Sequence, residues 1–261
     1  MSDPVVAPIA APIVTVSSIA DHVASVQLRR PPHNFFSLEM IAAVADAFEA
    51  LDHDDSCRVV VLCAEGKNFC AGADFTGAAP SYSTADLYRA AVRLFRTRKP
   101  IIAAVQGAAI GGGLGLALVA DFRVAAPEAR FSANFARLGF HQGFGLSVTL
   151  AGLVGQQRAS ELLYTGRRVN GDEAFAIGLV DRVVQLDRVI EEATTLAVEI
   201  AASAPLAVES IRATLRGDLA DRVAAATERE AAEQLRLRET HDFVEGARAM
   251  AERRPPRFTR E

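Results

Sequence analysis

The feature that most constrains this chain is a glycine hinge between two apolar runs, within residues 101–125. Ile101–Val105 is short and wholly apolar, which predicts a buried strand. After the glycines at Gly111–Gly113, the apolar segment Leu114–Ala120 predicts a buried helix. A strand, a hinge and a helix leave free N–H groups at the helix start, where the helix dipole is positive. Glycines allow close approach to these donors, so the stretch suits a bound negative oxygen.

Two phosphate-binding patterns do not fit this stretch. The dinucleotide-binding pattern needs a third glycine where the chain has Leu116 or Leu118, and the P-loop needs a Gly-Lys-Ser/Thr sequence that the chain lacks. The remaining candidate is an oxyanion, such as the enolate of a thioester, which needs two converging N–H donors. A second glycine-containing loop, NFCAGADF at 68–75, offers the other donor.

On these motifs the chain resembles the crotonase (enoyl-CoA hydratase/isomerase) superfamily. The matching segments run in family order and cover most of the chain: FCAGADF at 69–75, KPIIAAVQGAAIGGGLGLALVADFRVA at 99–125, LLYTGRRVNGDEAFAIGLVDRVV at 162–184 and EGARAMAERRPPRF at 245–258. The resemblance implies an α/β fold, a spiral of ββα repeats with a C-terminal helical trimerisation region. We therefore expect a loose tail at 1–12, a spiral core at 13–200 and a helical region at 201–261.

Composition narrows the class of protein. Half of the 261 residues are hydrophobic, which allows a sizeable core, and the net charge of −4 argues against nucleic-acid binding. No apolar run approaches a membrane span, and no secretory signal is recognisable. The three cysteines lack metal-ligand spacing and favour reduced thiols in the cytoplasm. We expect no metal and no covalently bound cofactor, with coenzyme A entering as part of the substrate.

Local patterns predict the remaining elements. Strands are expected at 13–17, 23–28, 59–63, 130–133 and 179–184. Helices are expected at 38–51, 85–98, 146–154, 156–164, 189–202, 206–215, 219–238 and 242–253. Ser37 is expected to cap the first helix, and Ser83 or Thr84 the second. We expect the long loop at 64–83 and the loop at 134–145 to contain functional residues, because long loops in a compact domain are usually functional.

The resemblance assigns the two oxyanion donors by motif position. The backbone amides of Ala73 and Gly112 would hold the thioester carbonyl and stabilise an enolate or a tetrahedral oxyanion. The alternative is that both glycine-containing loops are tight turns that only pack and have no catalytic role. The backbone around Ala71 and Thr76 would meet the adenine of coenzyme A.

Arginine side chains are the expected phosphate ligands, because their planar forks suit phosphate oxygens. Arg29 and Arg30 are candidates for pantetheine or phosphate. Arg253 and Arg254 are candidates for the phosphates of coenzyme A. An ordinary solvated basic tail is the alternative for the last two.

The chain departs from the family at the positions that decide the reaction. Family hydratases carry two glutamates, where this chain has Gly115 and Phe135. The aspartate of the family's dehalogenases and dienoyl isomerases falls near Gly143. None of these residues can move a proton, whereas hydration needs a base and an acid, normally a carboxylate pair. We therefore expect that the protein is not a standard hydratase.

The loop at 134–145 offers other polar groups. His141 titrates near neutrality and is a candidate general base, with a loop histidine bonded to backbone as the alternative. Asn134 and Gln142 are expected to line the substrate site, and Asp74 is expected to brace its own loop. The acyl pocket should be apolar, which favours a large or aromatic acyl group, with core filling as the alternative. Its expected lining is Phe35, Phe36, Phe75, Gly111, Phe135, Phe140 and Phe144.

Three functions remain open from the sequence. The first is an acyl-CoA hydratase, isomerase or lyase with an unusual site. The second is a thioester hydrolase in which His141 activates water, and the third is a coenzyme A thioester-binding protein without catalysis. The expected partners are an acyl-CoA and other copies of the chain, as a homotrimer or a dimer of trimers, rather than nucleic acid or membrane.

Overall fold

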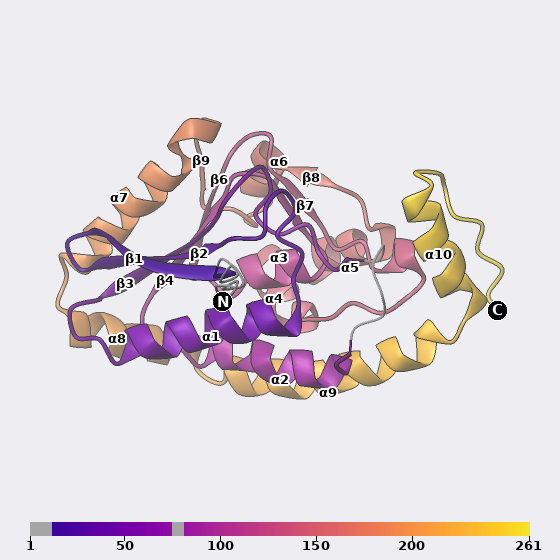
Figure 1. Cartoon of the computed structure of the whole chain (residues 1–261), viewed down its shortest axis with the longest axis horizontal. Coiled ribbons are helices and arrows are strands. Elements are labelled where there is room, and N and C mark those ends of the chain that lie inside the picture. Colours follow the sequence, from indigo (N-terminus) through magenta and orange to yellow (C-terminus); the bar gives the residue numbers. More distant parts are fainter. Residues whose placement is uncertain (1–11, 75–80) are drawn as a thin grey trace, which may run out of the picture.

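The computed structural model describes residues 12–74 and 81–261. Its larger sheet has six strands in the order β1-β2-β3-β4-β6-β9, and a smaller sheet has three in the order β5-β7-β8 (Figure 1). The strands are β1 (Val14–Ala20), β2 (Val23–Leu28), β3 (Val59–Ala64), β4 (Ile101–Val105), β5 (Ala108–Ile110), β6 (Phe122–Ala125), β7 (Arg130–Ser132), β8 (Val169–Asn170) and β9 (Arg182–Val183). Strands β1 and β2 pair antiparallel, and every later pair in the larger sheet is parallel.

Helices cover both faces of the larger sheet. They are α1 (Leu38–Asp52), α2 (Thr84–Phe95), α3 (Gly112–Ala117), α4 (Leu146–Val154), α5 (Gln156–Thr165), α6 (Gly171–Ala176), α7 (Val189–Ala201), α8 (Pro205–Arg216), α9 (Leu219–Arg238) and α10 (His241–Ala251), with 3-10 turns η1 (Ala136–Leu138) and η2 (Leu186–Arg188). In the described ranges no single helix is long and apolar enough to cross a bilayer. One pair bent by 106°, 186–201 with 205–216, passes that test of length and composition only when taken together.

The central strands are buried on both faces, as parallel strands between helical layers must be. Along β3, Val60 and Leu62 enter the core on the side of α1 and α2, while Val59 and Val61 enter the core under α7. Figure 1 shows α7 on one side of the sheet and α1, α2 and α9 along the other. The period of two therefore explains why β3 is apolar at every position.

Most predicted elements are present, and the α/β class is confirmed. The bounds of β2, β4, α4 and α9 match the prediction. The helix predicted at 85–98 ends at Phe95, because the Asp52 carboxylate accepts hydrogen bonds from the Arg98 and Lys99 amides (2.9 and 3.1 Å). The strand predicted at 179–184 shrinks to β9, because the Leu179 and Val180 amides turn to the Ala174 carbonyl.

Three short strands and one helix were missed, namely β5, β6, β8 and α6. Each is two to six residues long and pairs or packs with distant residues, so local periodicity carries little signal for it. The helix predicted from Leu114 begins earlier, at Gly112, so the glycines belong to its first turn. The ββα spiral, the trimerisation region and the division near residue 200 stay predictions.

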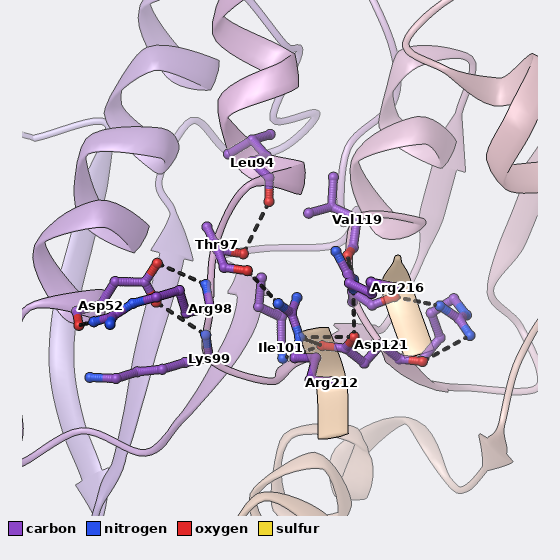
Figure 2. A network of polar contacts seen from close by, with 12 residues as sticks. Asp52, Leu94, Thr97, Arg98, Lys99, Ile101, Val119, Asp121, Arg212 and Arg216 are labelled. Carbon is purple, nitrogen blue, oxygen red and sulfur yellow. Dashed lines mark hydrogen bonds and ion pairs between the residues drawn. The ribbon is translucent and has the colours of Figure 1, made fainter. Parts of the chain in front are cut away.

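One partly buried carboxylate, that of Asp121, connects α8 to the start of β4. Asp121 accepts hydrogen bonds from the Ile101 amide (2.8 Å) and from Nε of Arg212 and of Arg216 (2.9 Å each), as Figure 2 shows. Arg212 also donates to the Thr97 carbonyl. Burial lowers the pKa of Arg216, and the Asp121 charge opposes that shift.

We predict that Asp121→Asn destabilises the protein by about 3–5 kcal/mol, because it leaves two buried guanidinium groups without their counter-ion. Urea unfolding measures the free energy difference. The matched control is Asp55→Asn, at an exposed position, which should stay within about 0.5 kcal/mol of the wild type. Equal stability of Asp121→Asn and the control would contradict a structural role for this network.

Candidate functional site

The two glycine-containing loops lie side by side. An isolated parallel bridge joins Cys70 to Ala109. The Cys70 amide donates to the carbonyl oxygen of residue 108 (2.8 Å), and the Cys70 carbonyl accepts from the amide of residue 110 (3.0 Å).

Glycine is required where these loops touch. A Cβ on Gly113 would lie 2.1 Å from the Cys70 carbonyl oxygen. A Cβ on Gly72, whose φ is +90°, would lie 2.9 Å from the Ile110 carbonyl oxygen. Real side chains essentially never come this close, so these two glycines permit the backbone-to-backbone approach.

The loop at 70–73 is also held from its other side. The Ala71 amide donates to the His33 carbonyl (2.9 Å), and the Gly72 carbonyl accepts from the Phe36 amide (3.0 Å). The fully buried Asn34 side chain donates to two carbonyls of the segment 65–68, at 2.9 and 2.8 Å. Neighbouring backbone therefore fixes the path of the loop up to Ala73.

The amides of Ala73 and Gly112 take no part in these hydrogen bonds. Within residues 12–74 and 81–261, neither amide donates to a backbone or side-chain acceptor. Gly112 opens α3, where the first N–H groups have no partner inside the helix. Both residues line one cavity of about 1390 Å³. The structure thus brings the two predicted donors to the same cavity.

Aromatic rings form the wall next to Gly112. A Cβ on Gly112 would lie 2.3 Å from the Phe36 ring, and a Cβ on Gly115 would lie 2.7 Å from Phe144. The rings of Phe36 and Phe144 meet edge to face with centroids 6.2 Å apart. Phe144 therefore fills the space into which a side chain at position 115 would extend, and Gly115 itself does not line the cavity.

No carboxylate lines the cavity among the residues that the structure describes. The stretch 75–80 contains no Asp or Glu either. Phe135 stands in the wall, with 7% of its surface exposed. The carboxylate pair that the sequence lacks is therefore not replaced by a carboxylate from another described part of the fold.

A tyrosine hydroxyl lies beside Gly143, the position near which the sequence analysis placed the aspartate of some family members. A Cβ on Gly143 would lie 1.7 Å from the Tyr88 hydroxyl and 2.7 Å from Nε2 of Gln234. Tyr88 is 6% exposed, and burial raises its pKa well above the usual range, with a further contribution from the charge of Glu230. Tyr88 is therefore a neutral hydroxyl group that lines the cavity.

The sequence analysis missed Tyr88 and Gln234. Tyr88 belongs to α2 and Gln234 to α9, and the sequence analysis placed both positions in predicted helices without assigning them a role. The sequence signal that could have identified them is a polar side chain at a helical position that faces the core. Only the packing of α2 against α9 brings the two beside Gly143.

The structure places His141 outside the cavity wall. Its ring Nδ1 lies 2.8 Å from the Gln142 carbonyl oxygen, and His141 is not among the cavity-lining residues. The Gln142 side chain also turns away and donates to Ser147 (3.0 Å). The histidine that lines the cavity is His33, which stacks on Phe35.

The structure also places Arg29 and Arg30 outside the cavity wall. Arg29 pairs with Glu65 at 2.8 Å and Arg30 with Glu39 at 2.5 Å, and neither lines the cavity. Asp74 is exposed and is not a lining residue, and Phe75 and Thr76 lie outside the described residues. Other predicted residues do line the cavity: Ala71, Gly111, Asn134, Phe135, Phe140, Phe144, Arg253 and Arg254.

The rest of the cavity wall is rich in arginine. It includes Arg130, Arg137, Arg167, Arg168, Arg238, Arg253 and Arg254. Five of these, Arg130, Arg137, Arg168, Arg238 and Arg253, form no salt bridge within the described part of the chain, whereas Arg167 and Arg254 do. A cationic cavity without carboxylates, in a protein of net charge −4, favours an anionic ligand.

The cysteines do not supply a nucleophile. All three are free and buried. Burial raises the pKa of Cys70 to about 12 and that of Cys63 to about 11. A reactive cysteine needs thiolate character and exposure, so Cys70 serves as a small buried residue between the loops.

Comparison with known proteins shows similarity of the whole chain to the enoyl-CoA hydratase/isomerase family. A family model described as enoyl-CoA hydratase/isomerase matches residues 18–261. A putative enoyl-CoA hydratase of Thermus thermophilus is 38% identical over 247 residues, covering 91% of this chain and 97% of the relative. The crotonyl-CoA hydratase of Syntrophomonas wolfei is 34% identical over 232 residues, covering 86% and 89%. A crystal structure of an enoyl-CoA hydratase/isomerase from Pseudoalteromonas atlantica has a TM-score of 0.86, with 33% identity and coverage of 95% and 100%.

We predict that Gly113→Ala destabilises the protein by about 1–3 kcal/mol, because the new methyl group forces Cys70 and α3 apart. The matched control is Gly152→Ala in α4, where an added Cβ meets no atom within 4 Å. The control should be stabilised by up to about 1 kcal/mol, since alanine favours a helix over glycine. Urea unfolding of both variants measures the difference, and a Gly113→Ala protein as stable as the wild type would contradict the backbone contact.

Proposed function

Because the chain belongs to the enoyl-CoA hydratase/isomerase family, we propose that it binds an acyl-CoA thioester with the carbonyl oxygen between the amides of Ala73 and Gly112. The observation that carries the proposal is that these two amides, without acceptors among the described residues, line one cavity. Two such donors fit an oxygen on which negative charge develops, as in an enolate. Removal of one oxyanion donor typically costs about 10²–10³ in rate.

The arginines support coenzyme A as the anionic part of the ligand. Arg130, Arg168, Arg238 and Arg253 line the same cavity and form no salt bridge within the described ranges. Guanidinium groups present planar pairs of donors that match phosphate oxygens. We assign the phosphates of coenzyme A to this arginine-lined part of the cavity and the acyl group to the part lined by Phe36, Phe135 and Phe144.

The reaction we propose is not standard hydration. Adding water across a double bond needs a base for the water and an acid at carbon, and no carboxylate lines the described wall. We propose an isomerase or lyase step on an enolate, with proton transfer by a group other than glutamate. The hydrolase alternative loses support, because His141 does not line the cavity.

A second candidate function is binding of coenzyme A thioesters without turnover. It is favoured by the same lack of carboxylates in the wall. It keeps the two amide donors and the arginines and predicts affinity without reaction. Turnover measured on a panel of acyl-CoAs separates the two candidates.

We also propose that the protein forms a homotrimer or a dimer of trimers. Support comes from three large apolar side chains of α8 that are exposed in the single chain, Leu206 (79%), Ile211 (60%) and Leu215 (81%). Their burial against other copies would remove apolar surface from water.

We predict that crotonyl-CoA is hydrated at least about 10²-fold more slowly by this protein than by a family member with both glutamates, since general acid–base catalysis contributes about 10²–10⁴. Loss of the ultraviolet absorbance of the unsaturated thioester measures the rate. Rates equal to those of the relative would show that Gly115 and Phe135 do not abolish hydration.

We further predict that the thioester C=O stretch of bound, carbon-13-labelled hexanoyl-CoA lies at lower frequency than that of the free compound, because two N–H donors polarise the carbonyl. Isotope-edited infrared spectroscopy measures the shift. S-hexyl-CoA, which has no carbonyl, serves as the control and should bind about tenfold or more weakly. A bound thioester with an unshifted stretch would remove Ala73 and Gly112 from the site.

A further inference from the structure

We propose that the acyl pocket selects acyl groups that carry a neutral oxygen, as a hydroxyl or carbonyl, away from the thioester, and that the Tyr88 hydroxyl donates a hydrogen bond to that oxygen. Tyr88 would then determine specificity. The inference rests on the proposed function, because it takes the thioester carbonyl to lie at Ala73 and Gly112.

Contacts along the cavity wall lead from the oxyanion donors to this hydroxyl. The Phe36 ring lies 2.3 Å from the position of a Cβ on Gly112, and it meets the Phe144 ring at 6.2 Å between centroids. Residue Gly143, next to Phe144 in the chain, contacts the Tyr88 hydroxyl. Because Ala73, Gly112, Phe36, Phe144 and Tyr88 all line this one cavity, the proposal takes the acyl chain to extend from the carbonyl along these two rings toward Tyr88.

Gly143 places no side chain against the hydroxyl. Both Gly143 and Tyr88 line the cavity. A Cβ at position 143 would lie 1.7 Å from the hydroxyl oxygen, so any side chain there would displace or cover it. The absence of a side chain at this position is thus a condition for contact between Tyr88 and a ligand.

The hydroxyl has a hydrogen to donate. Its raised pKa keeps it protonated, and its hydrogen-bond partners are the Gln234 side chain and the Phe144 backbone, which both lower the pKa, as groups that donate to the hydroxyl oxygen do. The neighbouring Gln234 side chain is held by its own bond to the His141 carbonyl (2.9 Å). The walls around Tyr88 include Leu87, Phe140 and Phe144, which offer no acceptor. A site that hydrogen-bonds a substrate oxygen rejects the analogue without it, because its own donor is then left unpaired.

The charge near Tyr88 limits the kind of oxygen. Glu230 is fully buried, and its carboxylate accepts from the Gly145 and Ser147 amides at 2.8 and 3.1 Å. Its negative charge acts on Tyr88 more strongly than the positive charge of Arg238 does. A carboxylate at the far end of the acyl group would therefore be repelled, whereas a neutral hydroxyl or carbonyl would not.

The test is a binding series on the full-length protein. Isothermal titration compares hexanoyl-CoA with its 3-, 4-, 5- and 6-hydroxy derivatives and with 5-carboxypentanoyl-CoA. We expect at least one hydroxyacyl-CoA to bind tenfold or more tightly than hexanoyl-CoA, and the carboxylate to bind more weakly than that hydroxyacyl-CoA. Tyr88→Phe should reduce the preference to threefold or less.

Two further variants keep the test decisive. Gly143→Ala leaves the hydroxyl in the chain but covers it, so it should abolish the same preference. Tyr164→Phe removes a hydroxyl from a residue that is 78% exposed and should retain the preference. Melting curves verify that each variant is folded.

Three results would overturn the inference: no hydroxyacyl-CoA preferred by the wild type, a preference that survives in Tyr88→Phe, or the carboxylate bound most tightly. In each of these cases hexanoyl-CoA itself still binds, so the proposed function stands. If neither coenzyme A nor any thioester binds the wild type, the proposed function fails and the inference fails with it.

Discussion

The site depends on one close approach, between the backbone of residues 70–73 and that of residues 108–113. Two hydrogen bonds join Cys70 to β5, and Gly113 and Gly72 have no side chains where the two backbones meet. Main-chain contact at this distance fixes relative position more tightly than side-chain packing can, since no rotamer is involved. The two amides that line the cavity are the groups this contact leaves without partners.

Next to these amides the fold places apolar rings where its relatives' chemistry needs carboxylates. Phe144 covers Gly115, and Phe135 stands in the wall. The change leaves a dry pocket whose one buried ionisable side chain, among the described lining residues, is Tyr88. A neutral hydroxyl can orient a substrate or recognise it, but it cannot replace two glutamates that exchange protons with water.

The charge of the cavity wall differs in sign from the net charge of the whole chain. The chain is acidic as a whole, yet its described cavity wall contains arginines and no carboxylate. Elsewhere arginines are neutralised by nearby glutamates. Arg29 pairs with Glu65 and Arg30 with Glu39, and neither arginine lines the cavity. Arg253 forms no salt bridge among the described residues, whereas the adjacent Arg254 pairs with Glu245 and Glu252 (2.6 and 2.5 Å), a difference that the sequence does not show.

The sequence by itself determined the family, the α/β class and most helices and central strands, because glycine spacing and apolar periodicity are local properties of the chain. The tertiary structure decided which side chains reach the cavity. It excluded His141, whose ring bonds to adjacent backbone, and it brought in Tyr88 from α2 and Gln234 from α9. Those contacts join residues more than fifty positions apart, and no local pattern encodes which face of one helix will meet a distant loop.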